Sequence, residues 1–214
     1  MARISSAMPW MTILSPLPTK INRATASLSA LTPEQAWEVY RQADCLFAEA
    51  QVEAALDNMA AAIQQQLADT NPVVVCLMNG GVVPFGRLLT RLPFPLQVDY
   101  VHATRYGARI HGGELEWIAG PFVSARDRTV LLVDDILDEG TTLAAIEARY
   151  RADGAKRVFK AVLTRKDRLR KVAIDADFVG LDIPDRYVFG YGMDYMGYLR
   201  NAPGIYAVAA KHEK

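Results

Sequence analysis

The stretch VLLVDDILDEGTTL, residues 130–143, decides the fold. A hydrophobic run forms a buried strand, two adjacent carboxylates follow it, and a turn at Gly140 opens a helix that begins near Thr141. In open α/β sheets, ligands bind beyond the carboxyl ends of the strands, which is where this turn lies. The stretch therefore predicts both an architecture and the place of a binding site.

Similar β-branched runs recur along the chain, at residues 73–77, 97–101, 129–133 and 157–163. Helix-like stretches lie between them, at residues 82–91 and 143–152. Hydrophobic runs without polar alternation, bracketed by helices, are typical of a parallel sheet that is covered on both faces. We therefore expect an α/β fold built on a doubly wound parallel sheet.

Two helices are expected before the first of these strands. Residues 32–35, Thr-Pro-Glu-Gln, combine a capping threonine with proline at the first helical position and glutamine at the third, so a helix is predicted from there to about Asp44. Residues 47–68 have apolar side chains three or four positions apart and predict an amphipathic helix, which Asn71 and Pro72 end.

Residues 1–31 differ from the rest, because they contain basic residues and three prolines but no acidic residue. An acid-poor, Ser-rich segment is typical of a targeting peptide, and it also fits a leader without a fold or an upstream start codon. Pro9, Pro16 and Pro18 would break an amphipathic helix or a secretory apolar core here. We expect residues 1–31 to be a disordered leader and residues 32–214 to be one domain.

Composition excludes several classes of protein. The 24 basic residues balance 24 acidic ones, so no global field attracts nucleic acid or an anionic membrane, and neither is an expected partner. With 51% hydrophobic residues the chain is not intrinsically disordered, and no apolar stretch approaches the roughly 20 residues of a membrane helix. Two cysteines make no disulfide framework, which fits a reducing compartment, so we expect a cytoplasmic protein.

The turn after the acidic pair has the properties of a phosphate site. Amide groups at a helix start favour an anion, Thr141 and Thr142 add hydroxyl donors, and Gly140 allows a positive φ or a close backbone approach. Asp134 and Asp135 should point to opposite sides of an extended chain, so one would face a ribose diol or hydrated Mg²⁺ while the other orders the loop. An acidic turn with an ordinary helix cap is the alternative.

In this order of strand, two acids, two aliphatics, Asp and Gly-Thr, the sequence resembles the type I phosphoribosyltransferases. The resemblance implies that residues 139–142 hold the 5-phosphate of 5-phosphoribosyl 1-pyrophosphate (PRPP), and that Asp134 and Asp135 hold the ribose hydroxyls with Mg²⁺. Glu139 departs from the many members that carry Thr there. A carboxylate about 4 Å from a phosphate is repelled by roughly 4 kcal/mol at an effective dielectric of 20, so we expect only the Glu139 amide, and not its carboxylate, to contact the phosphate.

Lys166 and residues 178–195 resemble the 6-oxopurine members of this family, the hypoxanthine-guanine phosphoribosyltransferases. The resemblance implies that Lys166 donates to the purine 6-oxygen, and an ammonium, a pure donor, disfavours the amino group of adenine. It also implies that Tyr187 stacks on the base, that Val188 presents main-chain groups to it, and that Asp194 lies beside the purine and Mg²⁺. Alone, Lys166 fits equally a solvated basic run, and Tyr187 fits core packing.

A further resemblance concerns the residues that would bind the pyrophosphate leaving group. Met78, Asn79 and Gly80 match a family loop in which a strained, sometimes cis, peptide presents backbone donors, and Arg200 matches a pyrophosphate-contacting arginine. The family often has Lys or Arg where this chain has Asn79, whose side chain carries no charge. A simple strand-to-helix turn also explains the glycine.

Residues 103–117, with Arg105 and Tyr106, resemble the mobile lid of the family, and a surface hairpin is the alternative. A small hood region beside the sheet is also implied. The implied enzyme is a hypoxanthine-guanine phosphoribosyltransferase of purine salvage, which makes IMP or GMP and pyrophosphate with Mg²⁺ and forms a homodimer or homotetramer. Asp138 is our candidate base near purine N7. The alternatives are a PRPP-sensing regulator, or transfer to xanthine or another 6-oxopurine.

Overall fold

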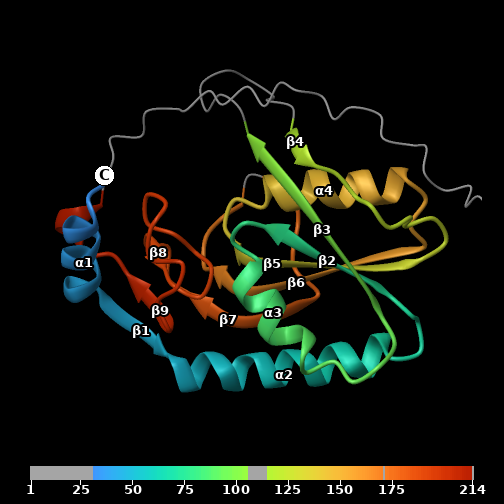
Figure 1. Cartoon of the computed structure of the whole chain (residues 1–214), viewed down its shortest axis with the longest axis horizontal. Coiled ribbons are helices and arrows are strands. Elements are labelled where there is room, and N and C mark those ends of the chain that lie inside the picture. Colours follow the sequence, from blue (N-terminus) through green and yellow to red (C-terminus); the bar gives the residue numbers. More distant parts are fainter. Residues whose placement is uncertain (1–30, 106–114, 171, 214) are drawn as a thin grey trace, which may run out of the picture. The chain divides into compact units, whose positions relative to one another are not determined.

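A six-stranded sheet forms the centre of the computed structural model, which describes residues 31–105, 115–170 and 172–213 (Figure 1). Its strands are β2 (Val73–Met78), β3 (Gln97–Arg105), β4 (Leu115–Ala119), β5 (Thr129–Leu137), β6 (Arg157–Lys166) and β7 (Phe178–Ile183). They lie in the order β4-β3-β2-β5-β6-β7, and only the β3–β4 pair is antiparallel. Such an order needs crossovers that place helices on the sheet faces.

Helices cover both faces of this sheet. Figure 1 shows α2 (Glu49–Leu67) and α3 (Val82–Leu89) on one side and α4 (Thr141–Ala152) on the other. In β5, Leu131 and Val133 pack in the layer of α2 and α3, whereas Val130 and Leu132 pack in the layer of α4. Because every second residue enters each layer, the whole strand must be hydrophobic. The predicted doubly wound sheet is confirmed.

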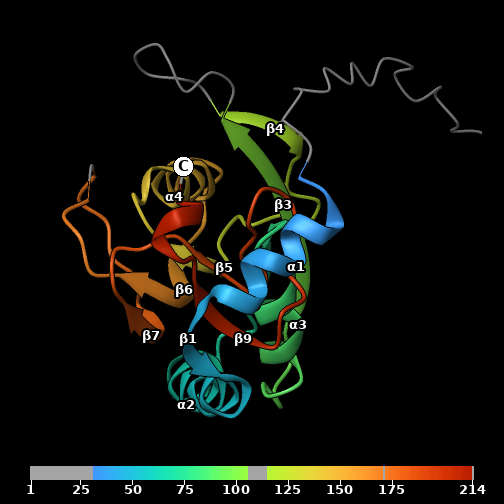
Figure 2. The ribbon, with the colours of Figure 1, turned by 90° about the vertical axis from the view of Figure 1, so that its left-hand side faces the viewer.

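A second, smaller sheet forms the hood, in the order β1-β9-β8 with antiparallel pairs. Its elements are β1 (Asp44–Ala48), β8 (Val188–Phe189) and β9 (Gly204–Ala207), accompanied by α1 (Pro33–Gln42) and the short 3₁₀ helix Ala210–His212. The predicted capping box is present at the start of α1, where the Gln35 amide donates to the Thr32 hydroxyl. Figure 2 shows α1, β1 and β9 from the hood side.

Strand β1 was not predicted, and the two expected helices were placed too close together around it. The first helix ends at Gln42 and the second begins only at Glu49. The strand is largely exposed and owes its conformation to pairing with β9, about 160 residues later in the chain. No local pattern reports that pairing.

Several strands are longer than predicted. β5 continues through Leu137 and β6 through Lys166, because their parallel ladder continues past the hydrophobic runs to the pair Leu137–Arg165. Asp134, Asp135 and Lys166 therefore stand on strands and not on loops. Among the described helices, none is long and apolar enough to cross a membrane.

The segment expected to be a lid has its two arms in the structure. The end of β3 and the start of β4 pair in an antiparallel ladder, so residues 103–105 and 115–117 form hairpin arms. Tyr106 lies outside the described residues, as does the expected leader apart from Leu31. Leu31 packs against the cluster of Val39, Phe189 and Val208 in the hood.

Candidate active site

The turn between β5 and α4 has the expected geometry of an anion site. Gly140 has φ of 77° and is the N-cap of α4, as the sequence indicated. A Cβ at Gly140 would lie 2.4 Å from Cγ2 of Ile174, so both the conformation and the space require glycine. Residues 134–143 line a cavity of about 430 Å³ in front of this turn.

The electrostatics of this helix start favour an anion. No side chain caps α4 by a hydrogen bond in the described structure, and its first turn carries no acidic residue. The amides of the first turn therefore keep their donors and the positive end of the helix dipole for a ligand. Glu139 lines the same cavity, and after the hydrogen bond and charge of Asp138 its negative charge also contributes to the raised pKa of Arg168.

Asp134 and Asp135 line this one cavity together, so the expectation that they point to opposite sides is wrong. The alternation of β5 changes phase across them, because Ile136 packs in the same layer as Val133, three positions earlier. Burial raises the pKa of Asp134 well above its ordinary value, and the Asp135 carboxylate raises it further. Burial also raises the pKa of Asp135, although a hydrogen bond with Asp134 and the charge of Arg200 act in the other direction.

The loop after β2 lies directly against this acidic pair. The peptide bond between Met78 and Asn79 is cis. A Cβ at Gly80 would lie 2.0 Å from Oδ2 of Asp135, and a Cβ at Gly192 would lie 2.0 Å from the Gly80 carbonyl oxygen. Glycines thus allow three segments, the loop after β2, the end of β5 and the loop after β8, to meet at one place.

The expected purine residues line a second cavity, of about 280 Å³. Its lining includes Lys166, Tyr187, Val188 and Asp194, and it shares Asp135, Ile136 and Asp138 with the first cavity. Lys166 is buried, whereas Tyr187 is 42% exposed and can offer a ring face to a ligand. The structure therefore brings these residues together beside the turn between β5 and α4.

Asp138 lies between the two cavities and carries ion pairs to two cations. Its Oδ2 is 2.9 Å from Nζ of Lys166, and its Oδ1 is 2.8 Å from Nη1 of Arg168. Burial acts to raise the pKa of Asp138, but the hydrogen bonds and charges of Lys166 and Arg168 outweigh it and hold that pKa below its usual value. Asp138 is therefore ionised at neutral pH.

Arg168 and Asp185 are the site residues that sequence reasoning missed. Both belong to stretches that it noted, the basic run 165–171 and the segment 178–195. Nothing in a run of cations says which one turns toward the site, because neighbouring side chains point in different directions. Arg165, in the same run, pairs instead with Asp182.

Asp194 and Arg200 form an ion pair at the edge of the site. Nη2 of Arg200 is 2.6 Å from Oδ1 of Asp194, and Nη1 donates to the Gly192 carbonyl oxygen at 2.6 Å. The second Asp194 oxygen accepts from the Gly197 amide. Among the described residues no three acidic, His or Cys side chains make a metal cage. Mg²⁺ commonly uses one or two carboxylates plus substrate oxygens and water, which Asp134, Asp135 and Asp194 fit.

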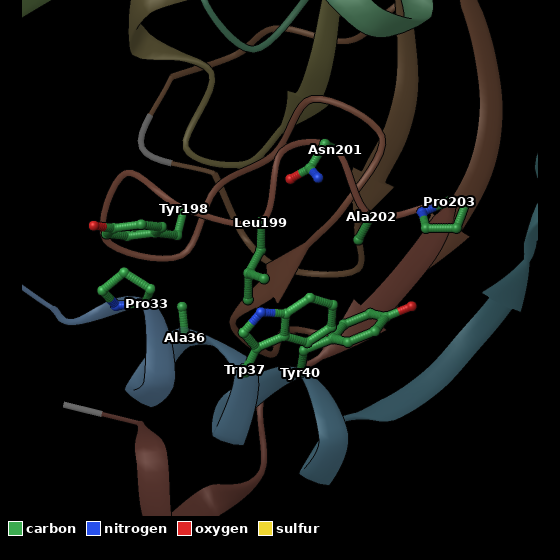
Figure 3. A pocket seen from close by; sticks show the side chains of 9 residues that line it. All are labelled: Pro33, Ala36, Trp37, Tyr40, Tyr198, Leu199, Asn201, Ala202 and Pro203. Atoms are coloured by element: carbon green, nitrogen blue, oxygen red, sulfur yellow. The ribbon is translucent and has the colours of Figure 1, made fainter.

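A third cavity, of about 270 Å³, lies in the hood and away from this chemistry. Figure 3 shows Trp37, Tyr40, Tyr198 and Leu199 around it, on α1 and the loop before β9. Its lining contains no charged side chain. The two polar cavities, and not this apolar one, hold the groups that can perform catalysis.

Comparisons with known proteins agree with this geometry. A family model described as "Phosphoribosyl transferase domain" matches residues 42–196. A protein of Bacillus subtilis (strain 168) named hypoxanthine-guanine phosphoribosyltransferase is 30% identical over 161 residues, which cover 75% of this chain and 89% of that protein. One of the same name from Staphylococcus epidermidis is 31% identical, over 78% of this chain and 93% of its own.

A solved structure of similar fold is the hypoxanthine phosphoribosyltransferase of Staphylococcus aureus. It superposes with a TM-score of 0.75 at 28% sequence identity and covers 78% of this chain and 92% of its own. The region of the chain that matches the family model contains the residues that line both polar cavities, and it leaves out only the two ends of the chain. The chain therefore belongs to the phosphoribosyl transferase family.

Proposed function

We propose that this protein transfers the 5-phosphoribosyl group of PRPP to hypoxanthine or guanine, giving IMP or GMP and pyrophosphate in purine salvage. The main support for this proposal is the position of two cavities, one in front of the turn between β5 and α4 and one lined by Lys166. The two cavities share Asp135, Ile136 and Asp138. A phosphorylated ribose in one cavity thus places its anomeric carbon toward a base in the other. The names of the relatives from Bacillus subtilis and Staphylococcus epidermidis support the same substrates.

The sugar phosphate is held by main-chain groups at the start of α4. The amides of residues 139–142 and the hydroxyls of Thr141 and Thr142 surround one phosphate, while Asp134 and Asp135 hold the ribose hydroxyls. The Glu139 carboxylate stays outside the cradle and only its amide contributes. The loss of translational and rotational freedom occurs at binding, so the reaction begins from an aligned pair of substrates.

The purine is read by one cation and one ring. Lys166 donates to the 6-oxygen, and Tyr187 stacks on the base, an interaction worth about 1–3 kcal/mol. Val188 and Asp194 lie along the base edge through their main-chain groups. Asp138 accepts the purine proton near N7 while N9 attacks the anomeric carbon and the bond to pyrophosphate breaks.

The leaving group departs toward the loop after β2. Met78, Asn79 and Gly80 offer main-chain donors to pyrophosphate, and Arg200 adds a positive charge. Mg²⁺ held by Asp194 and the Asp134–Asp135 pair would neutralise the phosphate oxygens of PRPP. The lid to which the resemblance assigns Arg105 and Tyr106 would serve to exclude water from the cationic ribose.

A substrate panel tests this proposal. The protein is mixed with PRPP and Mg²⁺ and with hypoxanthine, guanine, xanthine or adenine, and nucleotide and pyrophosphate are quantified in each reaction, with a chelator as the metal control. We expect product from hypoxanthine or guanine and little from adenine. Product from xanthine alone would move the assignment to another 6-oxopurine. No product from any base would favour a PRPP-sensing regulator.

The assembly and the compartment are proposals of the same kind. We infer a homodimer or homotetramer without nucleic acid or membrane partners, supported by an apolar surface at Val98, Tyr100 and Phe122, where the Tyr100 and Phe122 rings are in contact. Sedimentation equilibrium should give a multiple of 23.6 kDa, and a monomer at micromolar concentration would contradict it. A cytoplasmic location is checked by cell fractionation.

A further inference from the structure

Four charged side chains in the purine cavity and at its edge alternate in sign and close into a ring. Lys166 Nζ lies 2.9 Å from Asp138 Oδ2 and 3.8 Å from Asp185 Oδ1. Arg168 Nη1 lies 2.8 Å from Asp138 Oδ1 and 3.4 Å from Asp185 Oδ1. Each anion therefore has two cations, and each cation has two anions.

The two oxygens of Asp138 have different partners in this ring. Lys166, which holds Oδ2, is also the group that donates to the purine 6-oxygen in the proposed function, so it must leave Oδ2 when a base binds. Arg168, which holds Oδ1, lies outside the residues that line the purine cavity. It can therefore keep its contact while the base is bound.

We propose that Arg168 is a positioning residue that acts through Asp138. It holds Oδ1, so that Oδ2 faces the base when Lys166 turns from Asp138 to the 6-oxygen. Asp185 stays near Lys166 as its counter-charge during that exchange. The inference rests on the proposed function and adds to it a residue that does not line the purine cavity.

The physical reason is that a freed carboxylate would otherwise lose its orientation. With Lys166 engaged by the base, Asp138 without Arg168 has no remaining ion-pair partner among the described residues, and its side chain is 36% exposed. An exposed aspartate then samples several rotamers and protonates more readily. A displacement of about 1 Å at a reacting group can cost about 10²-fold in rate.

Three variants test the role of Arg168. Arg168→Gln removes the charge and Arg168→Lys keeps it. Arg165→Gln is the control, because Arg165 belongs to the same basic run but pairs with Asp175 and Asp182, and none of these three residues lines the purine cavity. We expect Arg168→Gln to lower kcat about 10- to 100-fold with KM for PRPP unchanged within about twofold. The lysine variant should recover most of kcat, and the Arg165 control should match the parent.

The pH profile separates this role from a structural one. Asp138 is faced by Lys166 and Arg168, with Asp185 and Glu139 as the nearby acids in the same network. Removing the Arg168 charge should move the acid limb of kcat to higher pH, because the carboxylate then protonates more easily. A variant that merely loosened the fold would lower the plateau and leave the limb in place.

A double-mutant cycle decides whether Arg168 acts through Asp138. In an Asp138→Asn background, measured at high enzyme concentration, Arg168→Gln should change kcat less than twofold. An equal loss in both backgrounds would show that Arg168 contacts substrate directly, and it would overturn the inference. An Arg168→Gln variant with the same kcat as the Arg165→Gln control would also overturn the inference. An inactive parent would overturn the proposed function and, with it, this inference.

Discussion

Gly140→Ala tests the geometry of the phosphate turn. A side chain at φ of 77° costs roughly 1–2 kcal/mol, and the smaller entropy of the unfolded alanine chain offsets about 0.4–1 kcal/mol of that. The new Cβ would also lie 2.4 Å from Cγ2 of Ile174, which must shift, and overpacking costs about 1–3 kcal/mol. We expect a loss of about 2–4 kcal/mol in the free energy of unfolding.

Gly154→Ala is the matched control. Its φ is 89°, but a Cβ there would come no closer than 3.6 Å to any atom, the nearest being Cγ of Arg126. It should therefore show the backbone cost alone, about 1 kcal/mol, or about 2–4 °C in Tm for a chain of this size. Denaturant titration and calorimetry measure both variants, and a PRPP saturation curve should show a raised KM only for Gly140→Ala.

Ile174→Ala isolates the steric part. In that background the Cγ2 atom is absent, so Gly140→Ala should cost at least about 1 kcal/mol less than in the parent. If Gly140→Ala and Gly154→Ala lose the same stability, or if the cost is unchanged without Cγ2, the close approach to Ile174 is not what requires glycine at this turn.

The other predictions concern single side chains. Asp138→Asn should lower kcat about 10²- to 10⁴-fold with little change in KM, and unchanged turnover in steady-state assays would remove its role as the base. The same variant should be less stable than the parent at pH 7, because the ion pairs hold the folded pKa of Asp138 below its ordinary 3.8. This stabilisation is present above pH 3.8 and disappears as the pH falls through the folded pKa. Denaturation curves measured at several pH values would show the loss. Lys166→Ala should raise KM for hypoxanthine and weaken selection against adenine, and an unaltered purine KM would count against it. Gly86→Ala, inside α3 with open space around its Cβ, should stabilise by about 0.5–1 kcal/mol in denaturant titration, and a loss would show strain that the structure does not contain.

Much of the site was predictable because its parts are local in the sequence. The phosphate turn follows its strand within a few residues, so the order of hydrophobic run, acids, glycine and threonines indicates the strand, a turn at Gly140 that allows a positive φ or a close approach, and the helix start together. The hydrophobic runs likewise predicted parallel strands with helices on both faces, because a strand buried on both sides cannot alternate with polar residues.

Other features depended on contacts between distant segments. β1 is a strand because β9 pairs with it, and Gly80 is required because Asp135 of another strand lies against it. Strict alternation placed Asp134 and Asp135 on opposite sides, whereas the change of phase in β5 turns both to one cavity. Periodicity assumes a regular strand, and it cannot register such a change.

The sequence by itself determined the α/β class, the places of the main strands along the chain and the turn that we propose binds phosphate, since these follow from hydrophobic burial and backbone conformation over neighbouring residues. Only the tertiary structure decided that two cations of the run 165–171, Lys166 and Arg168, reach Asp138. That choice depends on the direction of each side chain and on partners far away in the chain. Charge pairing acts through space, so composition and spacing do not contain it.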